Sequence, residues 1–160
     1  MKAQKLKFVF ILFYISFLSF SCTSDIVYNN FQTIENTVWE KDKEYSFTFN
    51  VDDCVPPYDI ILTIRNNNLY PYQNIWLLFY AKDTLNNFVI QRDTVEFILA
   101  DESGKWHGTG ISLFQNKFNI KEKYSFPYNG EYSLYFGQGM RNEKLKGIQD
   151  LGLKIVPATK

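Results

Sequence analysis

Few residues in this chain combine the types and spacing that catalysis requires. The one histidine, His107, lies in the segment GKWHGTG, and no GxSxG nucleophile motif accompanies it. The acidic pairs Asp52–Asp53 and Asp101–Glu102 fall in segments whose composition predicts loops, where carboxylates are usually solvated. One histidine and two cysteines are too few ligands for a zinc site. The sequence therefore predicts no catalytic residue, no metal site and no cofactor, with His107 in a turn.

Aromatic side chains offer a different chemistry, the stacking of sugar rings. The candidate binding surface consists of Trp39, Tyr70, Tyr72, Trp106 and His107. Trp39 and Trp106 belong to it because we expect them at strand edges, whereas Trp76 lies in the most apolar segment and is expected in the core. Because aromatic residues favour strands and dominate cores, a purely structural role competes with this interpretation.

The two cysteines have different surroundings. Cys22 follows the residues Ser19, Phe20 and Ser21 at the end of an apolar run, as in the cleavage site of a bacterial lipoprotein, although Phe20 is bulkier than usual there. Cys54 lies among Asp52, Asp53 and two prolines, and we interpret it as a bystander thiol. A Cys22–Cys54 disulfide is the alternative in an exported protein, and it would exclude lipidation of Cys22.

The first 21 residues have the organisation of a secretory signal peptide. Lys2, Lys5 and Lys7 form a basic start, and the apolar run 8–20 has thirteen residues. Such a run rises only ~20 Å as a helix, whereas the hydrocarbon core of a bilayer is about 30 Å thick. We therefore predict a lipoprotein signal peptide at 1–21 and a mature chain that begins at a lipidated Cys22. Two or three acyl chains would anchor it stably in a membrane.

The remainder, 22–160, has the length and composition of one domain. Hydrophobic residues make up 46% of the sequence, which suffices for a full core, and no repeat or linker divides it. The formal net charge of zero gives no indication of a nucleic-acid partner.

Period-two alternation of apolar and polar residues runs through this domain. It predicts strands at 44–51, 58–66, 75–82, 88–99, 111–124, 130–138 and 151–156, with a hairpin turn at 83–87, a break or bulge at Gly108 and Gly110, and a turn near Asn116. Only 140–147 has helical leanings. About eight or nine short strands indicate an all-β fold, an antiparallel β-sandwich of the jelly-roll or immunoglobulin-like type. Charged residues among the outward positions argue against a membrane barrel.

Several segments resemble those of a known family. They are VYNNFQTI (27–34), the Trp39–Asp42 segment, RNNNLYPYQN (65–74), WHGTG (106–110), FPYNGEY (126–132), QGMR (138–141) and GIQDLGLKI (147–155). In this order and spacing, after the cysteine at 22, they resemble the GldH family of gliding-motility lipoproteins from Bacteroidetes-type bacteria. The residues that these motifs single out, besides Tyr70 and Trp106, are Arg65, Asn66, Asn67, Pro71, Gly108, Gly110, Gln138, Met140 and Arg141. Cys54 is not part of the family pattern.

The resemblance implies an outer-membrane lipoprotein, lipid-anchored through Cys22, that acts with gliding and linked protein-secretion proteins of the envelope. It implies no enzymatic activity. A carbohydrate-binding module with a glycan ligand is the alternative. The motif residues also have a structural interpretation, with the glycines at a bulge and Arg65 and Arg141 as partners of buried polar groups.

Replacing Cys22 by alanine tests the anchor. Only a thiolate accepts the diacylglycerol, so Cys22→Ala should leave an unlipidated precursor. The measurement is metabolic labelling with palmitate. Persistent labelling of Cys22→Ala would show that the lipoprotein interpretation is wrong.

Overall fold

The computed structural model describes residues 26–83 and 88–159. The signal peptide, Cys22 and most of the hairpin turn at 83–87 lie outside these residues. Within them, no helix is long and apolar enough to cross a membrane.

The described chain is built almost entirely of strands, as the sequence predicts. A single 3₁₀-helix, η1 (Glu35–Thr37), follows the first strand. The strands are β1 (Tyr28–Thr33), β2 (Val38–Glu40), β3 (Glu44–Val51), β4 (Tyr58–Asn67), β5 (Asn74–Asp83), β6 (Phe88–Ile98), β7 (Leu113–Tyr124), β8 (Gly130–Gln138), β9 (Lys144–Lys146) and β10 (Ile148–Pro157).

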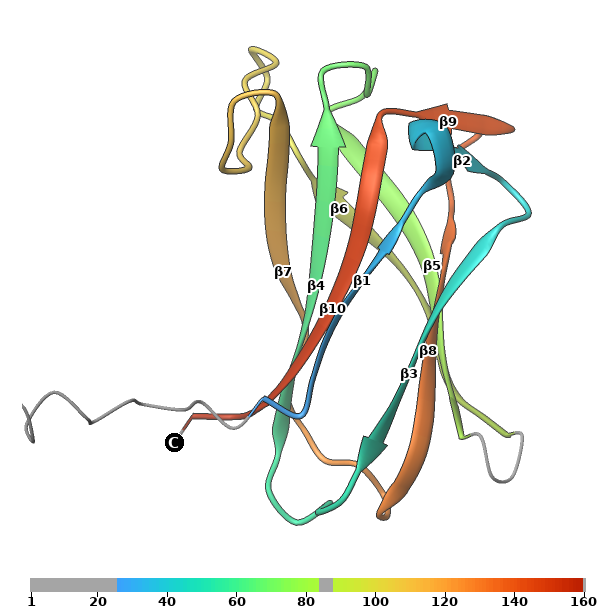
Figure 1. Ribbon diagram of the computed structural model, residues 1–160, viewed down its shortest axis with the longest axis vertical. Coiled ribbons are helices and arrows are strands. Elements are labelled where there is room, and N and C mark those ends of the chain that lie inside the picture. The colour runs from blue at the N-terminus through green and yellow to red at the C-terminus, as the bar shows by residue number, and fades with distance from the viewer. Residues whose placement is uncertain (1–25, 84–87, 160) are drawn as a thin grey trace, which may run out of the picture.

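The strands form two four-stranded antiparallel sheets with the orders β1-β10-β4-β7 and β3-β8-β5-β6, and β2 pairs with β9 beyond them. Figure 1 shows the two sheets as layers, with the β2–β9 pair across one end. The pairings are nested: β5 with β6, β4 with β7, β3 with β8, β2 with β9 and β1 with β10. Contacts of β10 with β4 and of β8 with β5 then roll this ribbon into a sandwich. Of the two predicted topologies, this one is the jelly roll.

The interior lies between the two sheets and is filled by alternate residues of each strand. In β3 the buried residues Tyr45, Phe47, Phe49 and Val51 alternate with more exposed ones, as period two requires. The other residues that the sequence predicts in the core are also buried, namely Ile60, Leu62, Ile64, Leu134, Leu153 and Ile155. The prediction of the core is therefore confirmed for these positions.

Trp76 is the exception, because 39% of its surface is exposed. The β5 segment is apolar on both faces, so its periodicity does not show which face turns inward. Ile75 and Leu77 are fully buried, which places Trp76 and Leu78 on the outer face of the sheet. The expectation that Trp76 lies in the core is wrong.

Two segments differ from the sequence prediction. No turn interrupts β7 near Asn116, which is a buried residue within the strand. Its side-chain Nδ2 donates to Asn66 Oδ1 at 3.0 Å, so the amide is tolerated inside. The segment 140–147 forms no helix; it contains β9, whose Leu145 lies opposite Trp39 and is buried.

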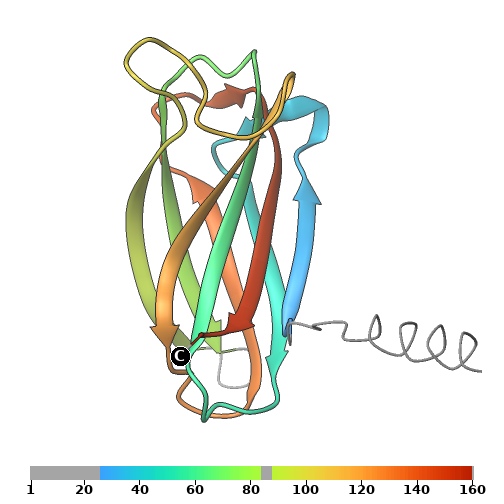
Figure 2. The same cartoon turned by 90° about the vertical axis from the view of Figure 1, so that its left-hand side faces the viewer.

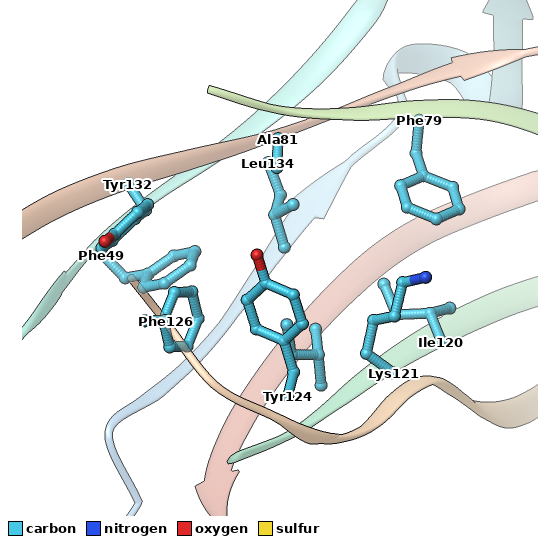
Figure 3. Close-up of a pocket in the computed structure, with 10 residues that line it drawn as sticks. Phe49, Phe79, Ala81, Ile120, Lys121, Tyr124, Phe126, Tyr132 and Leu134 are labelled. Atoms are coloured by element: carbon cyan, nitrogen blue, oxygen red, sulfur yellow. The ribbon is translucent and has the colours of Figure 1, made fainter. Parts of the chain in front are cut away.

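A small apolar pocket lies between the two sheets. Figure 3 shows this pocket, where Phe49, Phe79, Tyr124, Phe126 and Leu134 are among the lining residues. Its volume is about 20 Å³, which is room for about one water molecule. A pocket of this size holds no ligand as large as a sugar or a nucleotide.

Truncating a central core residue should strongly destabilise the domain. Phe47 is fully buried, and its ring lies 5.9 Å from Phe136 and 6.5 Å from Tyr28. Phe47→Ala should lower the free energy of unfolding by about 3–5 kcal/mol, because a closed site leaves a cavity. Leu78→Ala is the control, since Leu78 is 48% exposed, and it should cost about 1 kcal/mol or less. Urea denaturation of 23–160 measures both, and equal losses would contradict the assigned core.

Candidate functional site

Motif segments that are far apart in the sequence meet at one end of the sandwich. We call this the motif end: residues 67–74 between β4 and β5, 99–112 between β6 and β7, and 138–147 from the end of β8 through β9. Figures 1 and 2 show these connections together beyond the strand ends. The start of β1 lies toward the opposite end, since Tyr28 is in register with Ile155, and Ile155 with Ile60 near the start of β4.

Tyr70 is the centre of the motif end. It is buried, and its hydroxyl donates to the Asn74 carbonyl at 2.7 Å. Its ring lies 5.9 Å from Tyr72 and 6.3 Å from Trp106. Burial, with a smaller contribution from Tyr72, raises the pKa of Tyr70 far above the ordinary value of tyrosine. The phenol therefore acts as a neutral hydrogen-bond donor that holds the β4–β5 connection in place.

Trp106 joins the β6–β7 connection to its neighbours. Its Nε1 donates to Asn68 Oδ1 at 3.0 Å, and its ring lies 5.6 Å from that of Phe114 in β7. The indole is half-buried as a result. Its contacts account for the side chain as part of the scaffold of the motif end.

A chain of hydrogen bonds fixes the β8–β9 connection. The buried Gln138 donates from Nε2 to the Asn142 carbonyl at 2.7 Å and accepts from the Met140 backbone N–H at 2.9 Å. The Tyr72 hydroxyl donates to Asn142 Oδ1 at 2.7 Å. The β4–β5 and β8–β9 connections are thus held together by polar side chains. Arg141, in the β8–β9 connection, is exposed.

Two motif glycines are required by the close packing of the backbone. A Cβ at Gly110, where φ is +141°, would lie 1.8 Å from the Leu113 carbonyl oxygen. A Cβ at Gly108 would lie 3.0 Å from the backbone of Gln115, and Thr109 pairs with Gln115 by a β-bridge. The predicted break at these glycines is confirmed, because the chain folds back on β7 there.

Arg65 and Asn66 precede the motif end, within β4. Arg65 Nε donates to Gln115 Oε1 at 2.9 Å, and its NH1 lies 3.7 Å from Asp150 Oδ2. The guanidinium also lies 4.1 Å from the centre of the Phe31 ring. Asn66 is fully buried and its Oδ1 accepts the bond from Asn116, while its Nδ2 donates no hydrogen bond in the described structure. These two motif residues therefore contribute to sheet pairing.

Two residues of the candidate binding surface are not available for binding. Trp39 is fully buried, with its Nε1 donating to the Lys43 carbonyl at 2.8 Å and its ring 5.3 Å from Tyr45. The β2–β9 pair encloses it, an interaction that composition alone does not reveal. Tyr70 is buried as described. The placement of Trp39 and Tyr70 on a binding surface is therefore wrong.

Of the remaining candidates, Tyr72 and His107 line an open groove at the motif end with a volume of about 780 Å³, and Trp106 is not among its lining residues. Its lining includes Pro71, Tyr72, Glu96, Ile98, Asp101 and His107. His107 is exposed, and its backbone N–H donates to the Leu99 carbonyl at 2.9 Å. The pKa of Asp101 is lowered, chiefly by the hydrogen bond from the Ser103 hydroxyl. Backbone N–H donors and the nearby His107 make smaller contributions. The groove thus presents polar and apolar contacts with an anionic rim.

Sequence reasoning missed the amides that organise this end. Asn68 and Asn142 accept hydrogen bonds from Trp106 and Tyr72 respectively. Asn68 lies within a motif segment and Asn142 directly follows one, and this position is the feature of the sequence that could have identified them. Among the described residues, no group of three or more His, Cys, Asp or Glu side chains could hold a metal ion.

A matched pair of glycine variants tests the packing of the motif end. Gly147 and Gly104 both have positive φ, +90° and +82°, so alanine strains the backbone at each by ~1–2 kcal/mol. A Cβ at Gly147 would also lie 2.2 Å from the Tyr70 backbone nitrogen, whereas a Cβ at Gly104 would meet no other group within 4 Å. Gly147→Ala should cost a further ~1–3 kcal/mol in urea denaturation. Equal costs for the two variants would contradict this contact.

Solved structures are only remotely similar to this chain. Dimeric latent PorU from Porphyromonas gingivalis is 8% identical with a TM-score of 0.35, over 86% of this chain and 14% of that chain. The infectious bursal disease virus VP2 subviral particle is 11% identical with a TM-score of 0.39, over 84% of this chain and 33% of that chain. At such scores neither supports a conclusion.

Sequence relatives are much closer. The gliding motility lipoprotein GldH homolog of Christiangramia forsetii is 31% identical over 155 residues, 92% of this chain and 93% of the relative. Gliding motility lipoprotein GldH of Flavobacterium johnsoniae is 30% identical over 153 residues, 91% of this chain and 93% of the relative. The model of the GldH lipoprotein family matches residues 26–155, from just before β1 into β10. The chain therefore belongs to the GldH lipoprotein family.

Proposed function

We propose that this chain is a non-catalytic, lipid-anchored lipoprotein of the outer membrane that acts in gliding motility and the linked protein-secretion machinery. It works through protein–protein contacts made by the motif end. The observation that carries this proposal is the convergence of the separate motif segments on one end of the sandwich, away from the start of β1. Membership of the GldH lipoprotein family supports the motility association and the lipid anchor.

The position of the anchor makes the motif end the accessible one. Cys22 precedes Ile26 by four residues, which span at most ~14 Å when extended. The ten-residue strand β4 then leads from the anchored side to the motif end, a length of ~33 Å. A lipid at Cys22 would leave the motif end projecting from the membrane, where another envelope protein can reach it.

The aromatic residues favour protein contacts over the glycan alternative. Sugar stacking needs exposed, coplanar rings, but Trp39 is buried and Trp106 is packed against Tyr70. On the outer face of β5, the Tyr80 ring stacks on Tyr135 at 4.7 Å, and the Arg92 guanidinium lies 5.6 Å from its centre. Neighbours on both flanking strands cover that ring, so it makes no open platform.

Site-specific photo-crosslinking in intact cells tests the proposed contact surface. A photoreactive phenylalanine analogue replaces Pro71 or Arg141, both exposed at the motif end, and Lys117 serves as an exposed control within β7. We expect adducts with gliding or secretion proteins at positions 71 and 141 and none at 117. The measurement is immunoblotting followed by mass spectrometry of the adducts.

Two results would contradict the proposal. The first is an identical adduct pattern at all three positions, or no adduct at 71 and 141. The second is loss of secretion or motility in His107→Gln at normal protein abundance while the adducts at positions 71 and 141 persist, which would point to acid–base chemistry by the histidine and not to a lost contact.

A further inference from the structure

The end of the sandwich opposite the motif end carries exposed apolar side chains. We call it the Val55 end: residues 52–57 between β3 and β4, residues 125–129 between β7 and β8, and Ile26. Val55 is 85% exposed, Ile26 45% and Tyr128 36%. Figures 1 and 2 show both connections at the end where the C-terminus lies. Ile26 belongs there because Val27 N–H bonds the Ile155 carbonyl at 3.0 Å and Pro157 is in register with Tyr58.

The loop that carries Val55 is held in its exposed position. The Val55 N–H donates to Asp53 Oδ1 at 2.9 Å. The Cys54 N–H donates to Asn129 Oδ1 at 2.8 Å, which joins the β3–β4 connection to the β7–β8 connection. Pro56 and Pro57 follow and restrict the backbone further. These contacts favour the conformation in which Val55 is exposed.

The short chain between Cys22 and Ile26 indicates that a membrane surface covers the Val55 end. If Cys22 is lipidated, Ile26 is only the fourth residue after the acylated cysteine, at most ~14 Å of chain away. The apolar side chains of the Val55 end are thereby confined next to the headgroup layer. Valine, isoleucine and a tyrosine with a polar tip are side chains suited to that layer.

We propose that the Val55 end docks on the surface of the bilayer that holds the lipid anchor, with Val55, Ile26 and Tyr128 in the interfacial layer. The charges around them have both signs, with Asp52, Asp53 and Lys123 exposed, so the contact depends on apolar insertion and not on anionic lipid. Docking fixes the sandwich upright and points the motif end away from the membrane. This inference rests on the proposed lipidation of Cys22.

A depth measurement tests the docking. The full lipidated chain with Cys54→Ser has no free thiol, because the acylated Cys22 is blocked as a thioether. Adding Val55→Cys creates one site for an environment-sensitive thiol fluorophore. Ile111→Cys is the matched control, since Ile111 is 93% exposed at the motif end. Both proteins are reconstituted in phosphatidylcholine–phosphatidylethanolamine vesicles containing lipid with a nitroxide near the top of its acyl chain.

The emission of the fluorophore at position 55 should shift to the blue and be quenched by the nitroxide lipid. The emission of the fluorophore at position 111 should stay unquenched. Equal quenching at the two positions, or stronger quenching at 111, would overturn the docking. Mass spectrometry of the Cys54→Ser chain separates the two proposals. If that chain takes up a thiol probe, Cys22 is free and the lipid anchor itself fails. Quenching at 55 also has to persist at high salt, because loss with salt would contradict apolar insertion.

Discussion

Burial of alternate side chains between two sheets is the interaction on which the rest of this structure depends. Phe47 and Phe136 come from neighbouring strands of one sheet, and Leu62 and Leu153 face them from the other. Removing so much apolar surface from water provides the main driving force for the fold. It also fixes the register of each strand, because a shift by one residue would turn its apolar face outward. The connections at both ends are positioned by that register.

The motif end depends on this register and on a small set of polar contacts. Tyr70 and Gln138 each hold their own connection by a hydrogen bond, and Tyr72 links two connections through Asn142. Gly147 lets two backbones approach closely. Such contacts hold loops in one conformation without an extended apolar core. The side chains left exposed there, among them Pro71 and His107, are therefore presented on a rigid support. A surface of this kind suits recognition with little loss of conformational entropy.

Period-two alternation of apolar and polar residues allowed β3, which has one buried face, to be predicted to the residue, and β8 as well. It failed where the pattern is ambiguous or weak. β1 is an edge strand with mostly exposed residues, and β2 and β9 have three residues each, so no pattern identified them. Trp39 was expected at the surface and is buried, whereas Trp76 was expected in the core and is exposed. Burial of Trp39 requires the pairing of β2 with β9, which lies more than a hundred residues later in the chain. For the same reason, the spacing of the motifs did not show that they meet.

The nested order of the pairings has a consequence for the biogenesis of this domain. The hairpin β5–β6 joins neighbouring segments, but the outermost pair joins Tyr28 to Ile155. A chain that crosses a membrane from its N-terminus exposes β1 first and its partner β10 last. Until β10 arrives, β1 and β4 both lack a neighbour and present open edges that invite aggregation. The architecture thus makes folding a late event, with a high mean separation between contacting residues. A truncation within β10 would leave two unpaired edges in one sheet.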